Sequence, residues 1–431
     1  MDKSKVIDNK FLIIILLFFL GFLTRFIWLC YANPEPVSDF LGYKCIAENI
    51  LKNHIIGSAG EPSVYRLPLY PLFLSFFMLF NKSIFFLSLL SVFLSALIGV
   101  LVYLLTIEIY NNRNIALISS IFYILNPSFV FFSPVLSSEN LFAVLLLSSL
   151  ISILYFIKKK NSLFLYLSAL LLGLSLLTRG EAVFYLPTVI FYIFMFTNLK
   201  LKRKVSVIFS FILIFSITIS PWIIRNKIVF NEFGLSSTGG INFYFAHNPN
   251  TYGWVPLEKT PLKGMSIDRF EISKLGFKLG FEYIKKEDVY YIMNRIFKGT
   301  ILLWFPDFNI MNYGLLWSVG IPKNTLPNRE IVYILDLIAH YFYFLLFLLF
   351  VIFLIIVLFK RDLKKNYLLI LLILSNWFCY AVVFWAKARY RFFSEIIFST
   401  LAAYSIYTIY NFLVNIFKSS KYWHQRRSAN I

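Results

Sequence analysis

The chain has 431 residues, of which 59% are hydrophobic and only 14% are charged. An average soluble domain has roughly a quarter of its residues charged, so this chain cannot cover a soluble core of its size with a polar surface. The composition excludes an ordinary soluble protein and indicates one that uses the lipid bilayer as its solvent.

The formal net charge of +20 would suggest nucleic-acid binding in a soluble domain. Here the lysines and arginines lie mostly in short runs between apolar stretches, at 158–160, 200–204 and 360–365. Basic runs in such places orient membrane spans and contact anionic lipid headgroups. We therefore expect the bilayer as a partner and no nucleic acid.

Ten apolar stretches are long enough to cross about 30 Å of hydrocarbon. The first follows three lysines and is too long for the apolar core of a cleaved signal, so we interpret it as an uncleaved span. The sequence therefore predicts an all-α polytopic membrane protein of about ten transmembrane helices. The stretches lie at about 11–32, 83–109, 115–133, 140–157, 162–178, 183–199, 205–223, 332–359, 367–386 and 394–417.

A further apolar segment, 68–81, is short and begins with two prolines. If it does not cross and the N-terminus is cytoplasmic, both tails and all the basic runs lie inside, as the positive-inside rule requires. If it crosses, three of the basic runs move outside. We therefore predict a re-entrant or surface helix at 68–81 and cytoplasmic termini. Segment 298–320 is interrupted by Pro306 and Asp307, and its crossing stays open.

This topology leaves two large segments on the outer side. The first, about 33–82, is a loop of the membrane module 1–223 and carries the candidate catalytic acid. The second, 224–331, is too long and polar for a simple connector, and we expect it to form a modest outer-face subdomain. Residues 332–431 supply the C-terminal transmembrane helices.

Asp39 lies a few residues past the first span, ahead of a stretch that is typical of a short helix. Ser38 or Asp39 could simply cap that helix, which needs no further function. Alternatively, Asp39 is a carboxylate at the membrane surface that accepts a proton from a substrate hydroxyl. Tyr43 follows at four-residue spacing and shares the helix face with Asp39.

Arg66 and Tyr70 lie where the chain returns to the membrane interface. Pro68 and Pro71 stiffen this segment and fix both side chains. The planar guanidinium of arginine matches a phosphate group, so Arg66 is a candidate for binding one. The alternative is an interfacial arginine beside a tyrosine of the aromatic belt.

Glu139 lies in a tight outward turn between two spans. It could act as a metal ligand or a second base, or it could be a charge that stabilises a helix N-terminus. If a divalent metal binds, Asp39 and Glu139 are its candidate ligands, because the three cysteines have no metal-type spacing. Arg179 and Glu181 share another outward turn, where they could pair with each other.

Four other arginines are candidates for binding substrate. Arg25 lies inside the first span, where it could snorkel to the interface, although an intramembrane charge is a functional candidate by default. Arg225 ends a span beside an interfacial tryptophan. Arg389 and Arg391 open the last span from outside, against the positive-inside trend, which favours a bound anion there.

Together, in this order, these motifs resemble those of the bacterial members of glycosyltransferase family 39 and their GT-C fold relatives. That group includes the protein O-mannosyltransferases and the lipid A aminoarabinose transferases. The resemblance covers nearly the whole chain. The matching residues are Arg25, Ser38-Asp39, Tyr43, Ala47, Arg66-x-Pro-x-Tyr-Pro, Ser138-Glu139-Asn140-Leu141, Leu177-Thr178-Arg179, Pro221-Trp222-x-x-Arg225-Asn226, Asn248-Pro249-x-x-x-Gly253 and Arg389-Tyr390-Arg391.

The resemblance implies a GT-C bundle and an inverting transferase in the cytoplasmic membrane of a bacterium. Its donor would be a polyprenyl-phosphate sugar, and its acceptor a lipid, glycan or protein at the outer face. Asp39 matches the first-loop acid, the base or metal ligand of the family. The matched arginines at 66, 225, 389 and 391 would handle phosphate. Many relatives have an acidic pair where this chain has Ser38-Asp39, which counts against a metal.

Other membrane proteins that handle lipid-linked sugars remain alternatives: a polysaccharide polymerase, a ligase or a flippase. A flippase would be expected to show charges deep in several spans, whereas here the charges gather at the outward ends. A secondary transporter would be expected to show broken spans in corresponding positions of two halves. We therefore favour the transferase, with Asp39 in a pocket near Arg66, Arg225 and Arg389.

Overall fold

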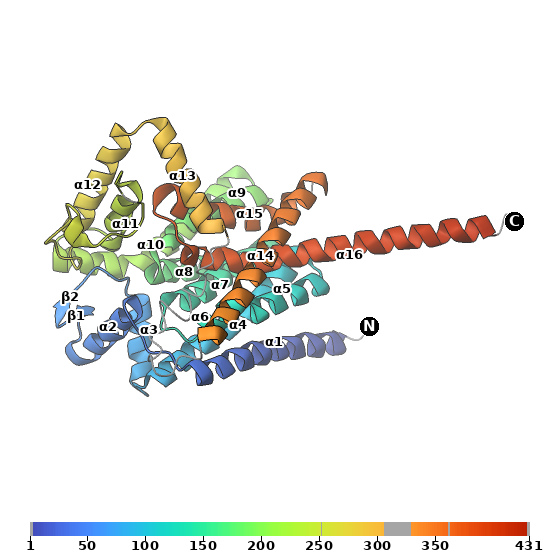
Figure 1. Cartoon of the computed structure of the whole chain (residues 1–431), viewed down its shortest axis with the longest axis horizontal. Helices are drawn as coiled ribbons and strands as arrows, with labels where there is room; N and C mark the ends of the chain where they lie inside the picture. The colour runs from blue at the N-terminus through green and yellow to red at the C-terminus, as the bar shows by residue number, and fades with distance from the viewer. Residues whose placement is uncertain (1–2, 251, 306–328, 361–362, 429–431) are drawn as a thin grey trace.

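The computed structural model describes residues 3–250, 252–305, 329–360 and 363–428, which form a helical bundle with a short β-hairpin (Figure 1). The N-terminal half consists of α1 (Lys3–Ala32), α2 (Asp39–Asn53), β1 (Gly57–Ser58), β2 (Glu61–Pro62), α3 (Leu69–Met78), α4 (Ile84–Tyr110), α5 (Arg113–Leu125), α6 (Pro127–Phe132), α7 (Ser138–Lys159), α8 (Ser162–Thr178), η1 (Gly180–Phe184), α9 (Tyr185–Phe196) and α10 (Leu201–Phe230). The remainder consists of α11 (Thr238–His247), η2 (Leu257–Lys259), α12 (Phe270–Lys286), α13 (Val289–Trp304), α14 (Arg329–Lys360), α15 (Leu363–Trp377), η4 (Phe378–Val383), η5 (Ala388–Arg391) and α16 (Phe392–Ser428).

Within the described residues, seven helices are long and apolar enough to cross a membrane. Four more apolar helices have 10–17 residues, and the ten predicted stretches fall on helices of these two groups. The predicted all-α polytopic fold is confirmed. The seven are Phe11–Ala32, Ile84–Tyr110, Ser138–Lys159, Leu201–Phe230, Leu337–Phe359, Leu363–Val383 and Ala388–Ile416.

Two segments show how local sequence sets helix length. α3 has ten residues, about 15 Å of helix, which is too short to cross and supports the prediction for 68–81. The predicted unbroken span 115–133 is wrong, because α5 ends at Leu125 and α6 begins at Pro127. Asn126 caps α6 by accepting from the Ser128 N–H, and a proline without N–H suits the first turn of the new helix. The part of 298–320 after α13 lies outside the described residues.

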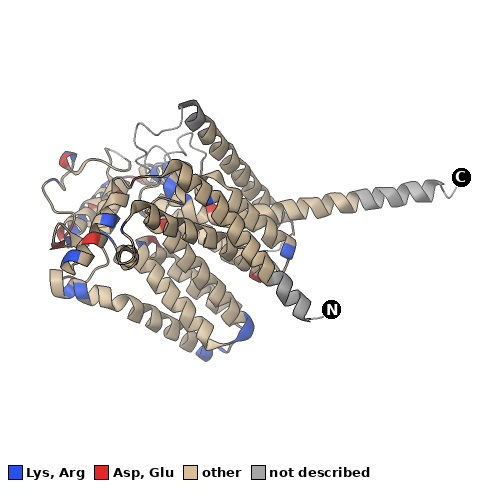
Figure 2. Cartoon of the chain, turned by 90° about the horizontal axis from the view of Figure 1, so that it is seen from below, with Lys and Arg blue, Asp and Glu red and all other residues tan. Residues whose placement is uncertain are grey.

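The helices place both large outer segments at one end of the bundle. In Figure 1, α1 begins and α16 ends on one side, while α2, the hairpin, α11 and α12 lie at the opposite end. The first loop contacts the second segment directly: Ser63 donates to Asp268 over 2.5 Å, and the Ser237 N–H donates to the Val64 carbonyl over 3.0 Å. Figure 2 shows long stretches of helix without charged residues between the charged ends.

One side chain of α2 shapes the first loop. The hairpin turns at Ala59 and Gly60, both with positive φ, as tight hairpin turns require. The Asn49 side chain donates to the carbonyls of Ile55 and Gly57 and accepts from the Gly60 N–H at 3.1 Å. The hydrogen bonds of this buried side chain join α2 to the hairpin. After the hairpin the chain continues to Arg66.

The second outer segment has a small apolar core of its own, on α11 and α12. The two helices cross closely at glycines: a Cβ at Gly240 would lie 1.9 Å from the Ser273 carbonyl oxygen, and one at Gly276 would lie 2.4 Å from that of Gly240. Only a residue without a Cβ fits such a crossing. The segment is therefore a packed layer at the end of the bundle that also carries the first loop.

Candidate functional site

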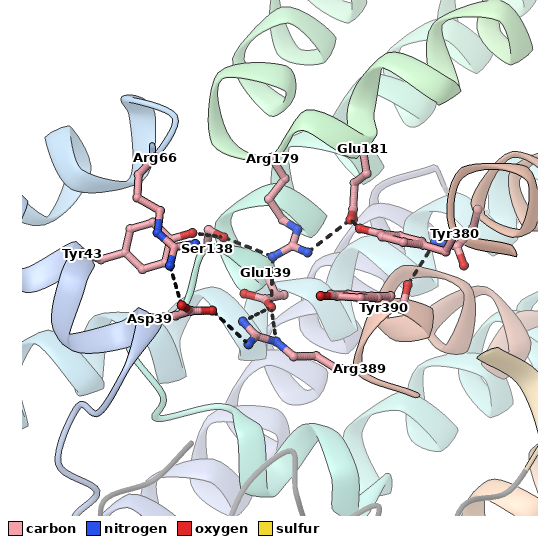
Figure 3. Close-up of polar contacts among 11 residues, drawn as sticks. Asp39, Tyr43, Arg66, Ser138, Glu139, Arg179, Glu181, Tyr380, Arg389 and Tyr390 are labelled. Carbon is pink, nitrogen blue, oxygen red and sulfur yellow. Dashed lines mark hydrogen bonds and ion pairs between the residues drawn. The ribbon is translucent and has the colours of Figure 1, made fainter. Parts of the chain in front are cut away.

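Six charged side chains meet at the end of the bundle that carries the two outer segments, and we call them the charge cluster (Figure 3). They come from α2, the loop before α3, α7, the turn after α8, η1 and η5, so distant parts of the sequence contribute. Three carboxylates and three guanidinium groups balance formally. The members are Asp39, Glu139, Glu181, Arg66, Arg179 and Arg389.

Asp39 is the most accessible acid of the cluster. Its Oδ1 accepts from Arg66 Nη2 over 2.5 Å, and its Oδ2 lies 3.8 Å from Arg389 Nη1. The Asp39 side chain is 43% exposed, against 2% for Glu139. Of the two capping candidates, Ser38 occupies the N-cap position of α2 but its side chain makes no capping hydrogen bond, and Asp39 is the first residue of the helix. The exposed carboxylate of Asp39 can meet a substrate.

Arg66 is held by aromatic rings as well as by Asp39. Its guanidinium carbon lies 4.4 Å from the ring centre of Tyr65 and 5.1 Å from that of Tyr43, a favourable arrangement for a cation. Tyr43 shares a hydrogen bond of 3.2 Å with Ser138 and packs edge-on against the buried ring of Tyr70. Tyr43 and Tyr70 therefore position Arg66 beside Asp39.

Glu139 anchors the centre of the cluster from the first turn of α7. Its Oε1 accepts from Arg389 through Nε at 2.8 Å and Nη2 at 2.5 Å, and Arg179 Nη1 lies 3.0 Å away. Two guanidinium groups thus compensate the cost of burying this carboxylate. Its other oxygen, Oε2, has no hydrogen-bond partner among the described residues. Glu139 fixes Arg389 in place and keeps one acceptor atom free.

The residues of the cluster do not fit a divalent metal as they are arranged. Asp39 and Glu139, the predicted ligands, are joined by the guanidinium of Arg389, so a positive charge already lies between them. In the described part of the chain, no group of three or more His, Cys, Asp and Glu side chains is suited to a metal ion. We derive no chemical step through a metal.

The far end of the cluster contains residues that sequence reasoning missed. Arg179 Nη2 lies 3.2 Å from Glu181 Oε2, so these two residues do pair. The Tyr380 hydroxyl donates to Glu181, and its ring stacks on Tyr390 with centroids 4.6 Å apart. Tyr390 lies within the Arg389-Tyr390-Arg391 motif, which was the available signal, but nothing in the sequence placed Tyr380 opposite it.

Two predicted arginines bind the protein itself. Fully buried Arg25 donates to Ser95 Oγ over 2.8 Å and to the Ile124 carbonyl over 3.1 Å, which joins α1 to α4 and α5. Arg225 donates to the carbonyls of Ser63 and Ile56 and so joins α10 to the first loop. Among the described residues, no hydrogen bond or ion pair joins either arginine to the charge cluster.

Arg391 lies two residues from Arg389 but turns into the bundle. Its guanidinium is fully buried, pairs with Glu395 at 3.4 Å, donates to the Phe305 carbonyl over 3.3 Å and lies 3.6 Å from the ring centre of Tyr343. Of the candidate residues, the structure thus brings together Asp39, Tyr43, Arg66, Tyr70, Glu139 and Arg389.

The chain matches a family model in part. The model, described as dolichyl-phosphate-mannose-protein mannosyltransferase, matches residues 62–224. That range includes Arg66, Tyr70, Glu139 and Arg179, while Asp39 lies before it. A search of curated proteins finds no match.

Solved structures are similar to the chain over most of its length. The apo oligosaccharyltransferase of Archaeoglobus fulgidus has a TM-score of 0.57 at 12% identity, over 95% of this chain and 51% of that one. The oligosaccharyltransferase AglB from the same organism, in complex with an inhibitory peptide and a dolichol-phosphate, has a TM-score of 0.54 at 12% identity, with the same coverage. ArnT from Cupriavidus metallidurans in the apo state gives 0.42 at 13% identity, over 90% and 77%.

The chain spans about half the length of the oligosaccharyltransferase that it matches. At this low identity the similarity shows the fold, and the family model adds a match in the N-terminal half. The GT-C-like fold predicted from the order of the motifs is confirmed: the chain shares its fold with the archaeal oligosaccharyltransferase.

Proposed function

We propose that the chain transfers a sugar from a polyprenyl-phosphate donor to an acceptor hydroxyl at the outer face of a bacterial cytoplasmic membrane. The observation that carries this proposal is a partly exposed carboxylate, Asp39, held between the guanidinium groups of Arg66 and Arg389. Such a site offers a base for the acceptor and positive charge for a leaving phosphate.

In this reaction the acceptor oxygen attacks the anomeric carbon of the sugar. The bond from that carbon to the phosphate oxygen breaks, and the phosphate leaves with the electron pair. Asp39 takes the proton of the acceptor hydroxyl. A single displacement of this kind inverts the anomeric carbon. The leaving phosphate is stabilised by arginine rather than by a general acid, because its oxygen needs no proton to leave.

The ion pairs suggest how the donor prepares the base. Asp39 Oδ1 accepts from Arg66, and Oδ2 lies 3.8 Å from Arg389, so the pair with Arg66 engages one of its two oxygens. A phosphate that binds the same two arginines competes with Asp39 and frees its carboxylate for the acceptor. Glu139 does not need to move, because its bonds to Arg389 and Arg179 hold that side of the cluster. Glu139 then acts as a positioning residue.

The arrangement of the chain suits a lipid donor. The membrane module 1–223 carries Asp39 and Arg66, while 332–431 carries Arg389, and the segment 224–331 contacts the first loop. A lipid-linked phosphate lies at the interface between bilayer and water. The archaeal oligosaccharyltransferase with the same fold was solved with a dolichol-phosphate, which supports a lipid phosphate as the donor here.

The alternatives make different predictions for the sugar bond. A flippase or transporter moves its lipid or solute and leaves the bond between sugar and phosphate intact. A polymerase or ligase breaks such a bond but extends or moves a glycan chain. The buried Arg25 is held by fixed hydrogen bonds and does not mark a path through the membrane, which favours a transferase.

The test is a transfer assay with the purified chain, a polyprenyl-phosphate sugar labelled in the sugar, and a membrane extract that supplies acceptors. We expect the label to move to a new molecule and free polyprenyl phosphate to accumulate, with Asp39→Asn as the inactive control. Label that stays on the donor with every donor sugar offered, in protein that is folded, would reject the proposal.

A further inference from the structure

Arg295 on α13 is a buried arginine with unused hydrogen-bond donors. It is 7% exposed, and its Nη2 donates to the Val382 carbonyl over 2.7 Å. Its Nε and Nη1 are buried and have no hydrogen-bond partner in the part of the chain that the structure describes. A charged group that lies buried without a partner is costly, so the arrangement indicates a missing ligand with negative charge.

The neighbours of Arg295 add donors rather than acids. The Tyr252 hydroxyl accepts from the Ala386 N–H over 3.0 Å and keeps its own proton to donate. Lys298, one turn further along α13, lies 5.6 Å from the ring centre of Tyr252. His247 donates through Nε2 to the Val383 carbonyl. Burial and the charge of Arg295 lower the pKa of His247 to about 4, so its ring is neutral.

The surroundings contain no matching negative charge. No ion pair joins Arg295 to a carboxylate among the described residues. α13 itself contains no acid, and Asp288, the residue before it, caps the helix by accepting from the Tyr291 N–H. Arg295 differs in this respect from Arg66, Arg179 and Arg389, each of which has a carboxylate partner.

The helix that carries Arg295 packs against elements of the charge cluster, but Arg295 is not a member of the cluster. α13 packs against η4 and η5, and η5 carries Arg389. Trp385, between those two elements, contacts Tyr390 edge-on and lies against Gly253, next to Tyr252. Trp385 thus lies between Tyr390, the neighbour of Arg389, and Gly253, the neighbour of Tyr252.

We propose that Arg295 and Tyr252 form a second binding site, for an oxyanion of the phosphate or carboxylate class. The anion would accept a charge-assisted hydrogen bond from either Nε or Nη1 of Arg295, which lie on opposite edges of the guanidinium, and the Tyr252 hydroxyl would add a further donor. Its source is either the headgroup of a lipid phosphate or an anionic group on a soluble substrate. The site goes beyond the proposed transfer reaction, which uses the charge cluster.

The test measures thermal stabilisation of the purified full chain by inorganic phosphate at constant ionic strength. Ligands that bind the folded state raise its melting temperature in a saturable way. The variants are Arg295→Met, which removes the donors, Arg66→Met, which alters the charge cluster, and Arg269→Met, an exposed arginine that serves as the matched control. Tyr252→Phe is a milder variant if Arg295→Met fails to fold.

We expect Arg295→Met to weaken phosphate binding at least about tenfold, because a hydrogen bond from a charged donor is lost. Tyr252→Phe should weaken it severalfold, and Arg66→Met and Arg269→Met should keep this binding phase. The proposal is overturned if phosphate stabilises the Arg295→Met and wild-type proteins equally. It is also overturned if the whole response disappears in Arg66→Met, since the anion then binds only in the charge cluster.

A second arm identifies the source of the anion. If added polyprenyl phosphate displaces the inorganic phosphate that still binds Arg66→Met, the site binds a lipid headgroup. If both bind together, the site serves an anion on another molecule. Both results support the site, and neither depends on sugar transfer, so a failed transfer assay leaves this test intact.

Discussion

The arginines of the charge cluster and the arginines inside the bundle differ in what they bind. Arg66 and Arg389 pair with carboxylates, and one of those, Asp39, is 43% exposed. Arg25 and Arg225 donate to hydroxyl and carbonyl oxygens that belong to the folded chain. A substrate phosphate can compete with an exposed carboxylate, whereas a backbone carbonyl cannot leave. Of these four arginines, only Arg66 and Arg389 are therefore placed to bind a substrate phosphate in the charge cluster.

The largest expected effect is on activity, from Asp39→Asn. Asn keeps the shape of the side chain but cannot accept the proton of the acceptor, and base catalysis contributes roughly 10²- to 10⁴-fold. We expect transfer to fall by at least about a hundredfold while the melting temperature stays near that of the wild type. The measurements are initial transfer rates at saturating donor and thermal unfolding in the same detergent.

If Asp39→Asn keeps most of its activity, the base must be another acid. Glu139 has a free oxygen in the cluster, and Glu48 lies on the same helix as Asp39. The same assay on Glu139→Gln and Glu48→Gln would then locate it.

Glu139→Gln should affect stability more than Asp39→Asn does. Its buried carboxylate compensates Arg179 and Arg389, and breaking a buried pair by removing one partner costs about 3–5 kcal/mol. Because Glu181 and Asp39 still contact these arginines, we expect the lower end of that range. Denaturant unfolding measures it. Equal stability of Glu139→Gln and wild type would contradict the anchoring function of Glu139.

Arg25→Met tests the other kind of arginine. Hydrogen bonds from a charged group contribute about 1.5–3 kcal/mol, so we expect a loss of stability of that size. The activity of the folded fraction should stay within about twofold of the wild type. Ser95→Ala, which removes a single acceptor of Arg25, is the matched control. A loss of activity at unchanged stability would indicate that Arg25 does bind substrate.

The smallest effect is expected from Lys44→Met, near the cluster but outside it. Lys44 pairs with Glu48 at 2.6 Å on α2, and both side chains are partly exposed. Such pairs contribute about 0–1 kcal/mol. We expect stability and transfer close to those of the wild type. A large loss of transfer would show that the site extends along α2 beyond the charge cluster.

The candidate site was predictable where charge stands out against its surroundings. Asp39, Arg66 and Arg389 were predicted because charged residues at the outward ends of apolar spans are few and costly. The same signal also selected Arg25 and Arg225, because a motif records that an arginine is present but not which oxygen it binds. Tyr380 was missed, since aromatic residues are common throughout this chain and one more carries no signal.

The sequence by itself determined the fold class and the approximate helices. Hydrophobic length and basic runs act locally, and the bilayer imposes helices on any apolar stretch long enough to cross it. Asn126-Pro127 likewise fixes the break between α5 and α6 through local capping. These features need no information about distant residues.

Only the tertiary structure decided which charges meet. Arg389 donates to Glu139 across 250 positions of sequence. Arg295 donates to the Val382 carbonyl in η4, and two of its donors have no partner among the described residues. Ion pairing and burial depend on distances in space, which the packing of α7, α13 and α16 sets. The physical reason is that charge compensation is a property of a site, whereas residue identity is a property of a single position.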